Sequence, residues 1–142
     1  MNSDVAADIE KVLTQYRIVA IVGASPDPER PSYKVADFLM KQGYRVIPVT
    51  PKADRILGQT AYPDLRSVTG PVEVVDVFRR SEEVPAIVEQ AIAIGAKAVW
   101  MQLGIVNEEA AAKARKAGLT VVMDRCMKKE TLRRQGLDPD SA

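Results

Sequence analysis

The sequence contains no histidine among its 142 residues. Histidine is the side chain that most often acts as a general base, a phosphoryl acceptor or a metal ligand near neutral pH. No other set of residues in the chain forms a recognisable catalytic or metal-binding group in its place. The absence therefore favours a protein that binds a ligand over an enzyme with acid–base chemistry of its own, and it predicts no metal site.

A large net charge and long apolar runs are also missing. The chain has 20 lysine and arginine residues against 19 acidic ones, so its net charge of +1 predicts no general affinity for nucleic acid or for an anionic membrane. No apolar run approaches the length that spans a bilayer, and the polar, acidic start does not resemble a signal peptide. The single cysteine, Cys126, excludes an internal disulfide framework and fits a reducing compartment. We expect a cytoplasmic protein.

What the chain does contain is enough apolar sequence for one core. Apolar residues make up 46% of the chain, and 142 residues are too few for two domains of ordinary size. We predict a single domain over residues 1–136, opened by an amphipathic helix at about residues 4–16. Residues 137–142 are expected to form a disordered tail.

Five short apolar runs alternate with helical patterns along this domain. The runs cover residues 18–22, 44–49, 72–78, 98–103 and 119–123; helices are predicted to begin near Ser32, Ser81 and Asn107, and a last basic helix covers residues 127–135. Residues 52–70 lack periodicity and predict a long connection with one short helical turn at residues 65–68. Pro48 lacks an N–H donor and is expected near the carboxyl end of its strand. The alternation predicts an α/β fold: a doubly wound, parallel, five-stranded sheet with helices on both faces.

The end of the first strand carries the main candidate for a ligand site, because such sheets bind ligands beyond the carboxyl ends of their strands. Gly23-Ala24-Ser25 follows the strand, and a proline-rich loop with Arg30 leads to a helix that begins near Ser32. A glycine turn before a helix amino terminus is typical of a phosphate site. The turn has one glycine where a dinucleotide fingerprint has three. The alternative is that Gly23 only permits a sharp turn and Ser25 only braces the loop.

The end of the second strand bears on which cofactor the site would hold. NAD-binding domains normally have an aspartate or glutamate here, which accepts hydrogen bonds from the ribose. This chain has Thr50-Pro51-Lys52, and a lysine suits the ribose phosphate of NADP or coenzyme A. The alternatives are a solvated surface lysine and, because Asp54 is close in sequence, an NAD site.

Two further strand ends offer ligand-binding side chains. Phe78 could stack on an adenine, and Arg79 and Arg80 could pair with phosphate, although one arginine could instead pair with Glu82 or Glu83. Which arginine contacts the ligand stays open. Gln102 and Gly104 offer an amide and a flexible backbone that suit pantetheine amides or a nicotinamide equally well.

Two reactive side chains have no assigned function at this stage. Cys126 lies beyond the fifth strand without a histidine to activate it, so we interpret it as a buried small hydrophobic residue. Asp76 lies within the third strand, where its carboxyl group either faces the ligand or is satisfied inside the sheet.

Six segments are distinctive as a set. They are Gly23-Ala24-Ser25, Arg30-Pro31-Ser32-Tyr33, Val46-Ile47-Pro48-Val49, Val75-Asp76-Val77-Phe78-Arg79-Arg80-Ser81, Trp100-Met101-Gln102 and Met123-Asp124-Arg125-Cys126. Over about residues 12–130 this set closely resembles the small, single-domain CoA-binding protein family. That family is similar to the amino-terminal CoA-binding domain of the succinyl-CoA synthetase alpha subunit. The resemblance implies a Rossmann-like CoA-binding fold.

The resemblance also implies where the ligand lies. In such proteins the ADP part of CoA lies over the first turn and the end of the second strand. The implied contacts are Gly23, Ala24, Ser25 and Arg30 near the pyrophosphate, Lys52 near a phosphate, and Phe78 and Arg79 along the adenosine.

One departure from the synthetase limits what the resemblance implies about activity. The synthetase uses a phosphorylated histidine on a second domain of its alpha subunit and a separate subunit that binds nucleotide. This chain has no histidine and no room for either domain, so it cannot run that mechanism alone. We predict a protein that binds coenzyme A or an acyl-CoA and is not itself an enzyme. The alternatives are an NAD(P)-binding redox enzyme or sensor and a regulatory or scaffold subunit that docks on a partner enzyme; a homo-oligomer also stays open.

Overall fold

The computed structural model describes residues 4–141, so residues 1–3 and Ala142, at the ends of the predicted domain and tail, lie outside the described part. The first helix, α1, spans Val5–Gln15 and buries Val12 and Leu13. The Asp4 carboxylate caps it by accepting a hydrogen bond from the Ala7 N–H at 3.1 Å.

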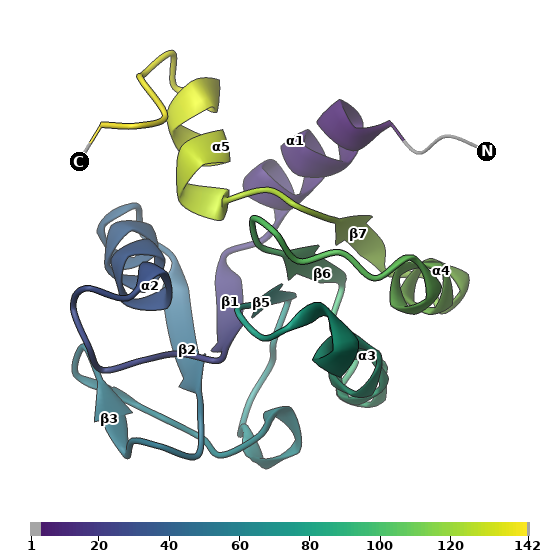
Figure 1. The fold of residues 1–142 in the computed structure, drawn as a ribbon, viewed down its shortest axis with the longest axis horizontal. Helices are drawn as coiled ribbons and strands as arrows, with labels where there is room; N and C mark the ends of the chain where they lie inside the picture. Colours follow the sequence, from purple (N-terminus) through teal and green to yellow (C-terminus); the bar gives the residue numbers. More distant parts are fainter. Residues whose placement is uncertain (1–3, 142) are drawn as a thin grey trace.

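A parallel sheet of five strands forms the centre of the molecule (Figure 1). Its strands are β1 (Ile18–Val22), β2 (Arg45–Val49), β5 (Val74–Val77), β6 (Ala98–Met101) and β7 (Thr120–Val122), in the order β2-β1-β5-β6-β7. Their residues are almost all buried, as expected of strands covered on both faces. The predicted doubly wound, Rossmann-like α/β fold is confirmed.

Helices cover both faces of the sheet (Figure 1). Helices α1, α2 (Pro31–Lys41) and α5 (Met127–Arg134) pack on one face, around the fully buried Trp100. Helices α3 (Val84–Ala93) and α4 (Glu108–Lys116) pack on the other. Within residues 4–141 we find no helix with the length and apolar character needed to cross a membrane.

Pro48 lies where its missing N–H costs little. It is the fourth residue of β2, as predicted, and β2 is an edge strand of the five-stranded sheet. Its carbonyl faces the outer edge and accepts a hydrogen bond from the Tyr62 N–H at 3.0 Å. An edge position therefore accommodates the proline without loss of a ladder bond to β1.

Two local predictions need correction. The connection over residues 52–70 contains the predicted helical turn, η1 (Leu65–Ser67), but also an unpredicted hairpin of β3 (Arg55–Ile56) and β4 (Gln59–Thr60). Its turn places Leu57 and Gly58 at positive φ, and a leucine there does not carry the usual asparagine–glycine signature.

The predicted cap at Ser81 is wrong. A 3-10 turn, η2 (Ser81–Glu83), precedes α3, and the Ser81 hydroxyl accepts a hydrogen bond from the Val106 N–H at 3.1 Å. The predicted start of the next helix at Asn107 is correct, because the Asn107 side chain accepts from the Ala110 N–H at 2.9 Å.

Candidate functional site

A groove of about 1290 Å³ opens at the carboxyl ends of the strands. The chain runs from β1 outward to β2 and then crosses back to β5, so the winding direction changes between β1 and β5. Ligands of doubly wound sheets bind at this switch point. The groove brings together ten of the eleven predicted site residues: Gly23, Ala24, Ser25, Arg30, Ser32, Thr50, Lys52, Phe78, Arg79 and Gln102.

The turn after β1 is packed tightly against the turn after β5. Gly23 has φ +90°, and a Cβ atom built on it would lie 2.7 Å from the Phe78 carbonyl oxygen and 2.8 Å from Cδ of Arg79. Only glycine avoids both the strained backbone and the overlap. Gly23 therefore lets the backbones after β1 and β5 lie side by side under the groove.

The backbone N–H groups of this turn are less available than the sequence suggested. Those of Gly23 and Ala24 both donate to the Val49 carbonyl, at 3.0 and 3.3 Å. The Ser25 hydroxyl accepts from the Asp27 N–H at 3.1 Å and so braces the loop. Within residues 4–141, the Ser25 N–H has no acceptor and stays available to a ligand.

The amino terminus of α2 offers further donors. Pro31 is the first residue of the helix, and Arg30 before it makes no side-chain cap. Ser32 is only 4% exposed and lines the groove, yet neither its N–H nor its hydroxyl has a hydrogen-bond partner within the described residues. An uncapped helix amino terminus with free donors suits an anion, because the helix dipole adds partial positive charge there.

The end of β2 places the predicted lysine in the groove and the competing acid outside its lining. Thr50 is 5% exposed, and its hydroxyl accepts from the Lys52 N–H at 3.2 Å, which fixes the backbone at this point. Lys52 lines the groove, whereas Asp54 does not. The acidic residue that an NAD site would use is therefore missing from the lining.

The end of β5 contributes Phe78 and one arginine. Both Arg79 and Arg80 pair with Glu83, at 2.7 and 3.2 Å, so Glu83 holds both guanidinium groups. The hydrogen bonds from Arg79 and then Arg80 lower the pKa of the Glu83 carboxyl. Of the two arginines Arg79 lines the groove and Arg80 does not, which selects Arg79 as the ligand candidate.

The end of β6 places Gln102 in the groove but not Gly104. Gln102 is 5% exposed, and its Oε1 accepts from the Met127 N–H at 3.2 Å, which ties β6 to the start of α5. Its amide nitrogen has no partner within residues 4–141. Gly104 donates its N–H to the Asp124 carboxylate at 2.7 Å and does not line the groove, so this predicted residue is not brought to the site.

The start of α5 supplies lining residues that the site prediction omitted. Cys126, Lys128 and Lys129 all line the groove, and Lys128 lies over the ring of Phe38 with its Nζ 5.6 Å from the centroid. They follow the fifth strand of the sheet, so their position beyond a strand end is the sequence signal that points to them. Cys126 is buried, as predicted, but its position at the groove was not foreseen.

Positive charge accumulates around the groove although the chain is almost neutral. Seven lining residues are lysine or arginine, against three that are acidic. Lys41, Arg79 and Lys129 each have an acidic partner within 4 Å. Within residues 4–141, the lining cations without such a partner are Arg30, Lys34, Lys52 and Lys128. The groove therefore suits a ligand with several negative charges.

Asp76 matches neither alternative that the sequence left open. Its side chain is fully buried within β5 and is not part of the groove lining, and both carboxyl oxygens lack a hydrogen-bond partner in the described part of the chain. Burial without a compensating partner raises the pKa of Asp76 well above its ordinary value.

Comparison with protein families gives one match that covers most of the chain. Residues 17–131 match the model of a family described as "CoA binding domain". An uncharacterized protein of Bacillus subtilis (strain 168), YneT, is 39% identical over 128 residues, which cover 90% of this chain and 95% of that protein.

Solved structures show the same fold. A hypothetical protein from Pyrococcus horikoshii OT3 is 45% identical, with a TM-score of 0.86 over 89% of each chain. The dinucleotide-forming acetyl-coenzyme A synthetase 1 of Ca. Korarchaeum cryptofilum is 24% identical, with a TM-score of 0.68 over 78% of this chain and 26% of that one. The similarity to the synthetase, which is much longer, is a similarity of fold.

Proposed function

The chain belongs to the CoA binding domain family, and from that membership and the charge of the groove we propose that it binds coenzyme A or an acyl-CoA. The observation that carries the proposal is that an uncapped helix amino terminus and four cations without an acidic partner in residues 4–141 meet in one groove at the switch point of the sheet. Coenzyme A carries a pyrophosphate and a ribose phosphate, so it can use both features.

Each part of the ligand has a suitable partner. The N–H groups of Ser25 and Ser32, together with Arg30, suit the pyrophosphate. Lys52 suits the ribose phosphate, and Phe78 provides an aromatic face for the adenine. The free amide of Gln102 suits the pantetheine amides.

Coenzyme A is favoured over NAD at the end of β2. NAD recognition uses an acidic side chain that accepts from the ribose hydroxyls. Here Lys52 lines the groove and Asp54 does not, which favours a ribose that carries a phosphate. Isothermal titration with coenzyme A, dephospho-CoA, NAD and NADP tests the proposal. Tighter binding of either nicotinamide nucleotide than of coenzyme A would contradict it.

The protein acts as a binding module in this proposal, without a reaction of its own. The chain has no histidine that could activate Cys126 as a nucleophile. A cytoplasmic protein that holds coenzyme A would pass it to, or regulate, a partner enzyme. A stoichiometric enzyme partner in a native purification would support that role.

Lys52→Gln is expected to weaken binding of coenzyme A by roughly three- to tenfold, because it removes a cation beside the ribose phosphate. Binding of dephospho-CoA, which lacks that phosphate, should change little. The control is Lys97→Gln, which removes an exposed lysine just before β6, at the amino end of that strand and outside the groove lining. Equal losses for both ligands would exclude a contact between Lys52 and the ribose phosphate.

A further inference from the structure

The segment after α5 returns to the groove. Helix α5 ends at Arg134, and the Leu137 N–H donates back to the Leu132 carbonyl at 2.9 Å, so the chain reverses direction along the helix. Pro139, Asp140 and Ser141 then line the same groove as the residues at the start of α5. Residues 137–141 belong to the segment that the sequence predicts to be a disordered tail, but in the structure they carry the hydrogen bonds described below. We call residues 137–141 the strap.

Hydrogen bonds within the strap fix its shape. The Asp138 carboxylate accepts from the Asp140 N–H at 2.9 Å. The Asp138 carbonyl accepts from the Ser141 hydroxyl at 2.8 Å and from the Ser141 N–H at 3.1 Å. Pro139, between them, restricts the backbone further. These hydrogen bonds hold the backbone around Asp140 in a turn that borders the groove.

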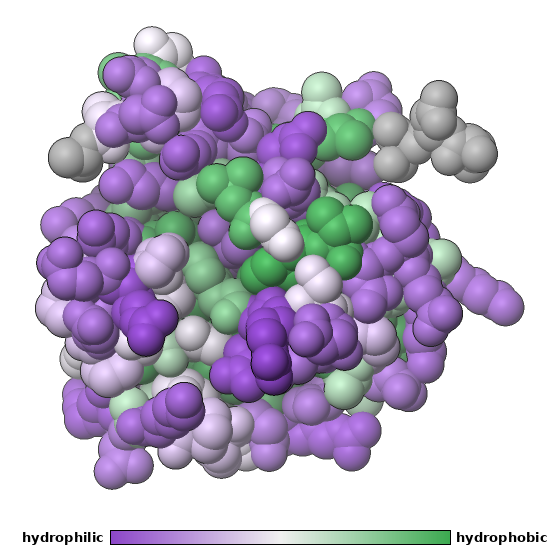
Figure 2. All heavy atoms as spheres, in the orientation of Figure 1, coloured by the Kyte–Doolittle hydropathy of each residue, from purple (hydrophilic) through white to green (hydrophobic). Residues whose placement is uncertain are grey.

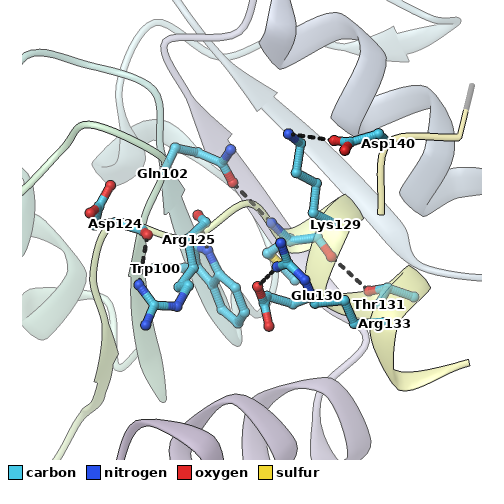
Figure 3. Close-up of polar contacts among 10 residues, drawn as sticks. Trp100, Gln102, Asp124, Arg125, Lys129, Glu130, Thr131, Arg133 and Asp140 are labelled. Carbon is cyan, nitrogen blue, oxygen red and sulfur yellow. Dashed lines mark hydrogen bonds and ion pairs between the residues drawn. The ribbon is translucent and has the colours of Figure 1, made fainter. Parts of the chain in front are cut away.

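Asp140 points toward a lysine of the groove (Figure 3). Its Oδ1 accepts a hydrogen bond from Nζ of Lys129 at 3.1 Å, and Lys129 is the third residue of α5. The carboxylate thus lies beside a lysine of the first turn of a helix, where a phosphate group would also bind well. The pair is weak, because 75% of the Asp140 side chain and 37% of the Lys129 side chain are exposed.

We propose that the strap is an internal anion that competes with an anionic ligand for Lys129, a groove lysine that none of the contacts proposed above uses, and so lowers the affinity of the groove. The inference rests on the proposed binding of coenzyme A for its ligand, but it applies to any polyanion that enters the groove. The weak, exposed pair of Asp140 with Lys129 can act in this way, because a ligand with several negative charges displaces the Asp140 carboxylate at a small cost in free energy.

Asp140→Asn tests the strap by replacing the carboxylate with a neutral group of similar shape. Coenzyme A should bind about two- to fivefold more tightly to this variant at low salt, and the gain should shrink at about 0.5 M salt. Asp138→Asn is the matched control: it removes the same charge two residues away and keeps an oxygen that accepts from the Asp140 N–H. Its dissociation constant should stay close to that of the wild type.

A second measurement separates the strap from the proposed ligand. Inorganic pyrophosphate, added to the wild type, should shift the amide NMR signals of Asp140 and Ser141 toward their positions in the Asp140→Asn variant. If coenzyme A fails to bind but pyrophosphate moves these signals, the proposed function is wrong and the strap stands. If coenzyme A binds the wild type and Asp140→Asn equally, the strap is wrong and the proposed function stands. If neither anion binds, both are wrong, because nothing enters the groove for the strap to exclude.

Discussion

Gly23→Ala is expected to lower both stability and ligand binding. The alanine Cβ would lie 2.7 Å from the Phe78 carbonyl oxygen, and that oxygen is backbone, so it cannot rotate away. Positive φ costs a non-glycine residue about 1–2 kcal/mol, and the overlap adds about 1–3 kcal/mol. We expect the free energy of unfolding to fall by about 2–5 kcal/mol in urea denaturation.

The same change should weaken coenzyme A binding by roughly tenfold or more, which corresponds to about 1.4 kcal/mol. The relief of the overlap must move Phe78 or Arg79, and both line the groove. The matched control is Gly43→Ala, because Gly43 has φ +92° but no atom within 4 Å of an added Cβ. It should lose about 1–2 kcal/mol of stability and keep its affinity. Equal losses of stability and of affinity for Gly23→Ala and Gly43→Ala would show that the packing of Gly23 on Phe78 contributes to neither.

Figure 2 shows hydrophobic atoms gathered near the centre of one face, among hydrophilic ones. Exposed apolar residues include Leu103 and Val106, in the loop between β6 and α4, and Leu103 also lines the groove. Leu103 therefore places an exposed apolar side chain beside the cations of the groove.

The fold was predictable because its signals are local. Each strand is an apolar run bounded by turns, and the starts of α2 and α4 are marked by Pro31 and Asn107. The hairpin near Leu57 carried no such mark, since its turn uses a residue that seldom adopts positive φ. Ser81 carried a misleading signal for a helix cap. Its hydroxyl accepts a hydrogen bond from the Val106 N–H, which is distant in the sequence.

The part of the groove built by the first four strand ends was predictable, but not which of its groups are free. Strand order brings Gly23, Lys52, Phe78 and Gln102 to one edge, and the sequence shows each at a strand end. The acceptor of the Gly23 and Ala24 N–H groups is a carbonyl of another strand, which only the folded chain reveals. The ion pairs of Glu83 with Arg79 and Arg80 also depend on side-chain geometry, which only the folded chain reveals.

Asp76 should make the stability of the protein depend on pH. Its pKa in the folded state is raised well above 3.8 by burial. Between the pKa of the unfolded chain and that raised value, the folded protein holds a proton that the unfolded chain has released. Stability is therefore greatest below the unfolded pKa and falls by about 1.4 kcal/mol per pH unit as the pH rises toward the folded pKa.

Asp76→Asn removes this titration while keeping the shape of the side chain. The difference in stability between the variant and the wild type should be smallest below the unfolded pKa, where Asp76 is protonated in both the folded and the unfolded chain. The variant should then gain stability relative to the wild type by about 1.4 kcal/mol per pH unit, up to the raised folded pKa. Urea denaturation at several pH values from about 4 to 7 measures the difference. Asp54→Asn, at an exposed aspartate, is the control for the loss of one negative charge and should follow the wild type.

If the free energies of unfolding of Asp76→Asn and the wild type change with pH in parallel, Asp76 ionises in the folded protein as easily as in the unfolded chain. A divergence would instead show that the central strand keeps an uncharged acid beneath the groove at a cost to stability. Because both carboxyl oxygens of Asp76 lack partners in the part of the chain that the structure describes, an amide introduced at the same position would lack them too. The measure of the effect of the Asp76 charge is therefore how the stability difference between Asp76→Asn and the wild type changes with pH, and not the absolute stability of either protein.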